Sequence, residues 1–204
     1  MQLFGDDICL RAAKHEDIDA IQAVDLDASR LFEPTGLIQE GPDGPQPVPA
    51  KFLEEGIKSE LATVAVFKPE DRIVGFTLAR RVSPDLYLDQ ISVSPAFGRR
   101  GIGAGLLQHV IGQADSLRLR GTVLSTFRDL SWNGPFYRQH GFTEIPRDQM
   151  KQWMLQLEAI QSYTMDVSLR CFMRRPGKWD QHWFRVPGFE GKRDEKRVAA
   201  NPDS

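Results

Sequence analysis

Glycines and arginines cluster just before an apolar stretch in the middle of the chain. Residues 98–105 read GRRGIGAG and contain four glycines and two arginines. Glycines let the backbone approach a ligand closely, and the unpaired N–H groups at the start of a helix favour an anion such as a pyrophosphate. So many glycines before a helix lower local stability, which makes a turn with nothing bound the weaker interpretation. The sequence therefore predicts a backbone anion site here.

Two better-known phosphate motifs do not fit this segment. The dinucleotide fingerprint requires G-x-G-x-x-G followed about 20 residues later by an acidic residue, and this chain has GIGAG with Leu119, Arg120 and Thr122 in that region. A nucleoside-triphosphate loop requires G-K-[ST], whereas the sequence here is GAGLL. Another phosphate-containing ligand is therefore expected.

The elements on either side would position this turn. Alternating apolar residues over 86–93 predict a strand that leads into it. Apolar residues at helical spacing follow from Leu106 to Leu117, and we expect this helix to end at Gly121, before a strand at 122–126.

The remaining pattern completes a chain of alternating strands and helices. Residues 36–49 contain too many Gly and Pro for regular structure and predict a loop. Further strands are expected at 8–12, 61–67, 73–81, 142–145 and 167–174, and further helices at 18–31, 50–58, 132–140 and 146–161. Together these elements predict a mixed sheet with helices on its faces.

Two segments resemble the GNAT N-acetyltransferase superfamily. GRRGIG at 98–103 is similar to the family pattern [QR]-x-x-G-x-[GA], with Gly98 where glutamine or arginine usually stands. A frame shifted to 100–105 matches literally but extends into the helix. SWNGPFYRQHGF at 131–142 resembles the second family segment, N-x-x-x-Y-x-x-x-G-F. The two segments occur in the family's order, and the resemblance covers roughly residues 7–175.

The resemblance implies a fold and a domain organisation. The expected fold is α/β (α+β), with a mixed, mostly antiparallel sheet of six to seven strands and helices on both faces. The fourth and fifth strands would splay apart. We expect residues 1–175 to form the acetyltransferase domain and residues 176–204 to form a charged C-terminal extension.

The resemblance also implies acetyl-CoA as co-substrate. Backbone N–H groups of the turn would bind its phosphates, and the free edge of the preceding strand would bind its pantetheine arm. The expected binding residues are Ile91, Ser92, Val93, Gly98, Arg99, Arg100, Gly101, Ile102, Gly103, Ala104, Asn133 and Tyr137. On chemistry alone, Asn133 is equally suited to capping the helix that it opens.

Two residues are expected to transfer protons. Tyr137 occupies the family's tyrosine position and would protonate the departing thiolate, although it could also only pack its helix. Asp89 is the candidate base. Side chains alternate between the two faces of a strand, so Asp89 is expected on the same face as Ile91 and Val93. It could equally bind a cationic acceptor or bond to the backbone.

The predicted function is an acetyl-CoA-dependent N-acetyltransferase that acetylates a primary amine of a small molecule or protein by direct attack in a ternary complex. The alternatives are a non-catalytic acetyl-CoA-binding regulatory module, and a basic, tryptophan-containing end that contacts nucleic acid or a partner. Nucleic acid is disfavoured by a net charge of −2.

Several other classes of protein are disfavoured. A membrane span is not expected, because the sequence has no apolar stretch of the required length. Cys9 and Cys171 do not have metal-ligand spacing, and we expect no metal and two reduced thiols. The first residues do not resemble a secretory signal, so we expect a cytoplasmic protein. The sequence leaves open whether the protein forms a homodimer.

Overall fold

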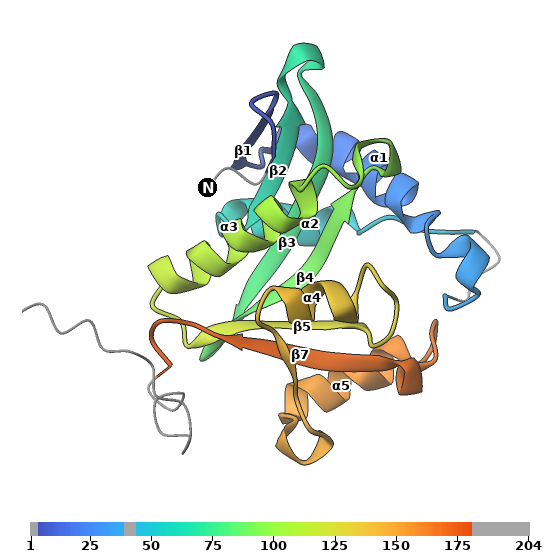
Figure 1. Cartoon of the computed structure of the whole chain (residues 1–204), viewed down its shortest axis with the longest axis vertical. Helices are drawn as coiled ribbons and strands as arrows, with labels where there is room; N and C mark the ends of the chain where they lie inside the picture. Colours follow the sequence, from blue (N-terminus) through green and yellow to red (C-terminus); the bar gives the residue numbers. More distant parts are fainter. Residues whose placement is uncertain (1–3, 39–43, 181–204) are drawn as a thin grey trace, which may run out of the picture.

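The computed structural model describes residues 4–38 and 44–180, which form a seven-stranded sheet with helices on both faces (Figure 1). The strands are β1 Ile8–Ala12, β2 Ala62–Phe67, β3 Arg72–Val82, β4 Asp85–Val93, β5 Gly121–Phe127, β6 Thr143–Glu144 and β7 Arg170–Pro176. The α-helices are α1 Ile18–Ser29, α2 Ala50–Lys58, α3 Ile102–Ser116, α4 Gly134–Gln139 and α5 Gln152–Gln161. Both the element order and the mixed sheet are as predicted.

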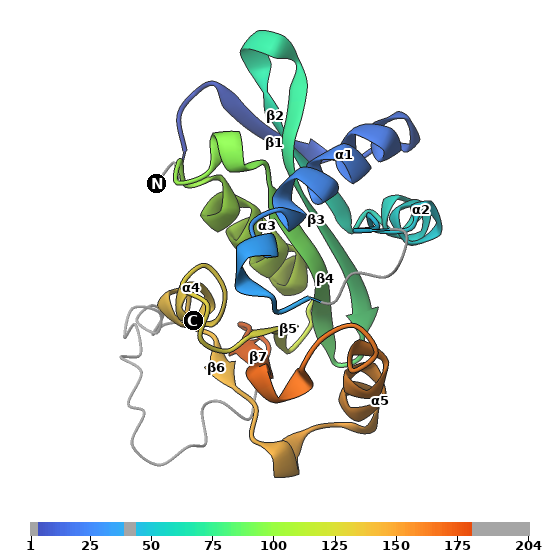
Figure 2. The same cartoon turned by 90° about the vertical axis from the view of Figure 1, so that its right-hand side faces the viewer.

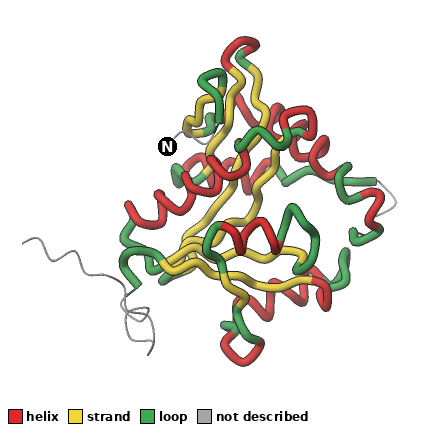
Figure 3. Tube along the Cα trace, viewed as in Figure 1, coloured by secondary structure: helices red, strands yellow, loops and turns green. Residues whose placement is uncertain are grey.

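The strand order in the sheet is β1-β2-β3-β4-β5-β7-β6, and only the β4–β5 pair is parallel. A parallel neighbour requires a crossover, which α3 supplies between β4 and β5. Figure 3 shows the strands running between helices on either side. The expectation of a mostly antiparallel sheet is confirmed.

The helices divide between the two faces of the sheet. Apolar residues of α1 and α2, such as Ile21 and Leu53, pack on β2 and β3, and α5 contributes Met154 to a cluster on the same face. Residues of α3 such as Leu107 pack on the opposite face together with Tyr137 of α4. Figure 2 shows α4 and α5 on opposite sides of β5 and β7.

The parallel strands β4 and β5 pair over a short stretch and then separate. Their register contains three pairs and ends at Leu88 and Leu124. The register of β4 against β3 shifts at the same place: Ala79 faces Leu88 and Leu78 faces Gln90, so that Asp89 is an extra residue. A bulge of this kind bends its strand and increases the twist. Figure 1 shows β4 and β5 diverging from their shared end, as the family resemblance predicts.

Two predicted helix boundaries are wrong. Gly121 begins β5 and does not close α3, which ends at Ser116. Arg118 ends the helix with a left-handed φ of 55°, and Leu119 N–H donates to the Ala114 carbonyl at 2.9 Å, a bond typical of helix ends. The expected helix over 146–161 is a 3-10 turn, Arg147–Gln149, followed by α5.

The last predicted strand is shorter at its start than expected, because residues Val167–Leu169 form a 3-10 turn and β7 begins at Arg170. Of the predicted extension at 176–204, only the first residues up to Asp180 lie within the described part of the chain. Across residues 4–38 and 44–180, no helix is both long and apolar enough to cross a membrane.

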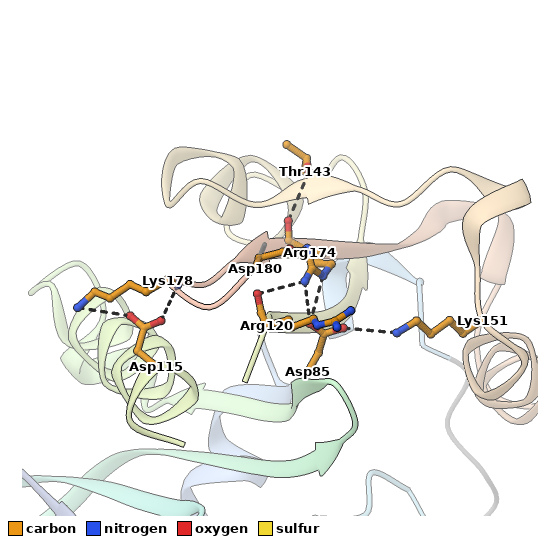
Figure 4. Close-up of polar contacts among 8 residues, drawn as sticks. All are labelled: Asp85, Asp115, Arg120, Thr143, Lys151, Arg174, Lys178 and Asp180. Atoms are coloured by element: carbon orange, nitrogen blue, oxygen red, sulfur yellow. Dashed lines mark hydrogen bonds and ion pairs between the residues drawn. The ribbon is translucent and has the colours of Figure 1, made fainter. Parts of the chain in front are cut away.

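A cluster of charged residues joins the end of β7 to its neighbours (Figure 4). The Arg174 guanidinium donates to the buried Asp85 carboxylate at 2.9 and 3.2 Å and to Asp180 at 2.5 Å. Lys151 adds an ion pair to Asp85 at 3.6 Å. Because Asp180 supplies one of the two carboxylates for a half-buried arginine, we propose that the domain extends through Asp180 and not only to residue 175.

The residues just after β7 also form hydrogen bonds with the end of α3 and the turn that follows it. Gly177 N–H donates to the Arg120 carbonyl at 2.7 Å, and Lys178 N–H donates to the Asp115 carboxylate at 3.0 Å. The Trp179 indole donates to the Asp115 carbonyl at 2.8 Å. These bonds attach the start of the predicted extension to the helix that follows the glycine-rich turn.

Candidate functional site

The turn at residues 98–104, here called the glycine loop, connects the end of β4 to α3. Arg99 and Gly101 both have left-handed backbone conformations, with φ of 60° and 79°. This conformation suits glycine and is strained for arginine. Left-handed Gly101 directly precedes the right-handed helix that begins at Ile102, and adjacent residues of opposite hand turn successive N–H groups toward one side, as in anion-binding loops.

The N–H groups of the glycine loop are available to a ligand. None of the backbone N–H groups of residues 99–104 donates a hydrogen bond to any other residue in the described ranges, and the first helical bond is Gly105 N–H to the Gly101 carbonyl at 2.9 Å. No side chain caps α3 at Gly101. The positive end of the helix dipole adds to these free donors, so the loop is suited to bind an anion.

The arginines of the glycine loop are both exposed. Arg100 stacks on the Phe97 ring at 4.9 Å, and Arg72 of β3 stacks on the same ring at 4.8 Å. Gly103 lies where β4 and α4 approach the loop, because a Cβ there would be 3.9 Å from Val93 and 4.0 Å from Phe136. The loop therefore combines free N–H groups with positive charge.

The space between β4 and β5 beyond their last paired residues, Leu88 and Leu124, is here called the gap. The free edge of β4 leads from the glycine loop toward this gap. Ser94 N–H donates to the Val74 carbonyl of β3 at 2.9 Å. Because backbone groups alternate in direction along a strand, the N–H and C=O groups of Ile91 and Val93 point away from β3, toward the gap left by β5. They are suited to bind an extended ligand chain. The Ser92 side chain points to the face covered by α1.

Asp25 of α1 is a buried residue of this region that the sequence analysis missed. Its carboxylate accepts from the Gln90 amide at 2.8 Å, the Ser92 hydroxyl at 2.9 Å and the Val48 N–H at 2.9 Å. It therefore joins α1, the segment before α2, and the part of β4 that has no β5 neighbour. The signal was present in the sequence: Asp25 lies four residues after Ile21, within the apolar stripe of the helix.

Tyr137 and Asn133 belong to α4 and the turn before it. Tyr137 is buried and packs edge-on against the rings of Phe136 and Phe142. Burial raises its pKa above that of ordinary tyrosine, and the positive charge of Arg170 partly opposes this shift. Asn133 precedes α4 without forming a side-chain capping bond, so the capping role considered for it is not observed.

The Asp89 side chain does not lie on the same face of β4 as Ile91 and Val93, which simple alternation predicts. Leu88 and Ile91 both pack in the cluster beneath α3, because the bulge at Asp89 shifts the alternation by one residue. Asp89 instead pairs with Arg80 at 2.9 Å, and Arg80 lies over the Tyr87 ring on the opposite face. Burial raises the pKa of Asp89, and the bond from Arg80 opposes this shift.

Aromatic residues line the opposite face near the gap. Phe32, which follows α1, packs against Phe127 at the end of β5 with ring centroids 5.7 Å apart, and against Trp132 at 6.3 Å. An isolated bridge joins Ile38 to Met165, just before β7. The segments after α1 and before β7 therefore meet beyond the gap, on the face away from α3 and α4.

A family model described as "Acetyltransferase (GNAT) domain" matches residues 60–144, which include β2 through β6, the glycine loop and α4. This match confirms the resemblance to the GNAT family that the two short segments indicate.

Solved structures share the fold at low sequence identity. N-acetylglutamate synthase from Neisseria gonorrhoeae, complexed with coenzyme A and N-acetyl-glutamate, is 18% identical with a TM-score of 0.61, and the match covers 83% of this chain but only 35% of that one. A GNAT-family acetyltransferase from Staphylococcus aureus Mu50 is 17% identical with a TM-score of 0.61, covering 83% of this chain and 98% of that one.

The ribosomal-protein-S18-alanine N-acetyltransferase from Escherichia coli is 15% identical with a TM-score of 0.57, covering 83% of this chain and 93% of that one. The names of the Neisseria and Escherichia proteins give different acceptors, and the name of the Staphylococcus protein gives none. The likeness therefore shows the fold, and the acceptor must be argued from the residues of this chain.

The hydrogen bonds of Asp25 predict a large contribution to stability. Asp25→Ala leaves three donors without this acceptor in a buried region, and we expect the free energy of unfolding to fall by about 2–4 kcal/mol. Asp19→Ala, on the exposed side of the same helix, should change it by less than about 0.5 kcal/mol. Urea denaturation of both variants measures the difference. Equal losses would show that the Asp25 bonds do not stabilise the structure.

Proposed function

We propose that this chain is an acetyl-CoA-dependent N-acetyltransferase that acetylates a primary amine of a small molecule or protein. The observation that carries the proposal is the set of free backbone N–H groups at residues 99–104, placed directly after the unpaired edge of β4. A diphosphate bound at the glycine loop and a pantetheine arm along Ile91 and Val93 would bring the acetyl group into the gap between β4 and β5. Acetyl-CoA supplies an activated acyl group as a thioester.

The two faces of the sheet give the two reactants separate routes. The glycine loop and Tyr137 lie on the side of α3 and α4, whereas Asp89, Phe32 and Phe127 lie on the other side. An amine arriving from that second side would meet the thioester in the gap. This arrangement supports direct attack in a ternary complex, because both reactants could reach the same place at the same time.

The proposed proton transfers balance the reaction. The amine nitrogen forms a bond to the thioester carbonyl carbon, the C–S bond breaks, nitrogen loses one proton and sulfur gains one. Burial keeps the Tyr137 phenol protonated, so Tyr137 would donate its proton to the departing sulfur. Asp89 would accept the proton of the amine directly or through water. Its partly buried carboxylate has a raised pKa, which makes it a stronger base than an exposed aspartate.

Removal of one loop N–H tests the diphosphate site. Gly103→Pro deletes a single N–H in the first turn of α3, where proline is tolerated, as Pro135 in the first turn of α4 illustrates. We expect acetyl-CoA to bind roughly 10–100-fold more weakly, since a hydrogen bond to a charged group contributes about 1.5–3 kcal/mol.

Gly103→Ala is the matched control for that experiment. It keeps the N–H and adds a Cβ that meets only ordinary contacts, so its affinity should stay within about threefold of the wild type. Isothermal titration calorimetry measures both variants. Unchanged affinity for Gly103→Pro would remove the Gly103 N–H from the acetyl-CoA site.

Loss of the Tyr137 hydroxyl tests the proposed acid. Tyr137→Phe should lower kcat by roughly 10²-fold while leaving the Kd for acetyl-CoA near that of the wild type, because general acid catalysis contributes about that much. Arg138→Gln, an exposed change on the same helix, should leave both values unchanged. The assay measures the release of the CoA thiol for each amine of a panel, with acetyl-CoA in excess. A wild-type kcat in Tyr137→Phe would exclude the role.

A further inference from the structure

Arg170 begins β7 on the face of the sheet that α5 covers. Its guanidinium donates to the Ser125 carbonyl and hydroxyl, each at 3.1 Å, and to the Gln161 side-chain oxygen at 3.3 Å. It also stacks over the Phe127 ring at 4.7 Å. These contacts hold the side chain in place, yet none of them supplies a negative charge.

Other arginines of the fold have carboxylate partners. Arg11 bonds to Asp17, Arg128 bonds to Glu144, and Arg174 bonds to Asp85. Arg170 is half-buried, and within residues 4–38 and 44–180 it forms no ion pair, while its Nη1 atom has no hydrogen-bond acceptor.

The lack of a negatively charged partner for Arg170 within the described residues destabilises the folded protein. A partly buried charge without a counter-charge is unfavourable. Burial accordingly lowers the pKa of Arg170 from the usual arginine value. A bound anionic group would offset this cost.

The position of Arg170 relates it to the proposed reaction centre. Residue Arg170 lies opposite Phe127 in the β5–β7 register, and Phe127 contacts Phe32 on the proposed acceptor side. The charge of Arg170 also acts on Tyr87 of β4 and on Tyr137 of α4, which flank the gap from its two faces. A group bound to Arg170 would therefore lie beside the gap, on the side opposite the glycine loop.

We propose that Arg170 binds a carboxylate carried by the acceptor, so that the substrate class is an amine with a carboxylate on the same molecule. The inference rests on the proposed N-acetyltransferase function and adds its specificity. A guanidinium held by Ser125 and Gln161 presents its remaining N–H groups in a fixed direction, which suits a planar carboxylate. The aromatic rings of Phe32 and Phe127 provide an apolar wall next to it.

The carboxylate could come from a free amino acid or from an acidic residue of a peptide. The experiment therefore uses two panels of matched acceptors, with acetyl-CoA saturating. One pairs free amino acids with their carboxamides. The other pairs amidated dipeptides that carry Asp or Glu at the second position with those that carry Asn or Gln. We expect the carboxylate member of at least one panel to have a kcat/KM about 10²-fold higher than its neutral partner. The panel that shows the preference identifies the source.

Variants of Arg170 connect the preference to this side chain. R170Q should reduce the carboxylate-to-carboxamide ratio to about one, and R170K should retain part of it, while the Kd for acetyl-CoA stays unchanged in both. R81Q, an exposed change at the end of β3, should keep the wild-type ratio. If R170Q does not fold, the wild-type ratio and R170K still decide the question.

The outcomes separate this inference from the proposed function. Acetylation without preference for the carboxylate, or a preference that survives in R170Q, overturns the role of Arg170 and leaves the acetyltransferase intact. Failure to bind acetyl-CoA overturns the function and the inference together. If acetyl-CoA binds but no acceptor reacts, calorimetry with CoA and N-acetylated carboxylates or carboxamides replaces the rate assay. Equal binding of the two then contradicts the inference.

Discussion

The parallel pairing of β4 with β5 ends at Leu88 and Leu124, and the functional site depends on this separation. The bulge at Asp89 bends β4 where the pairing stops, so that the following backbone keeps β3 on one edge and loses a neighbour on the other. Unpaired backbone groups within a sheet are costly unless another partner binds them. Asp25 stabilises this part of β4 through Gln90 and Ser92 and thereby keeps the edge in place.

The separation also connects the two faces of the sheet. Elsewhere, continuous strands keep the face covered by α3 apart from the face covered by α1, α2 and α5. At the gap, the charge of Arg170 acts on Tyr137 from the other face. A carrier bound along β4 and an acceptor held on the far face would therefore meet at one place. We propose that Tyr137 lies at that meeting point, where a binding module without catalysis would not require it.

Local patterns in the sequence predicted much of the fold. The spacing of apolar residues placed α1 and the strands β1 to β5 within two residues of their observed bounds, because burial on one face imposes that spacing directly. The glycine loop was found for the same kind of reason, since its left-handed Gly101 and free N–H groups are local properties. The C-terminal boundary of α3 was misplaced because Arg118, and not a glycine, adopts the left-handed conformation that ends it.

Features that depend on distant contacts were not predicted. The bulge at Asp89 is defined by its pairing with Leu78 and Ala79, so alternation alone assigned this residue to the wrong face. That Arg170 forms no ion pair within residues 4–38 and 44–180 became visible only when β5, β7 and α5 were assembled. The direct test of the central claim is the change in backbone amide resonances when 15N-labelled protein binds acetyl-CoA or S-acetylpantetheine, which lacks the diphosphate. The account predicts that acetyl-CoA alone shifts the amides of residues 99–104 strongly. Strong shifts elsewhere, with these amides unmoved, would contradict it.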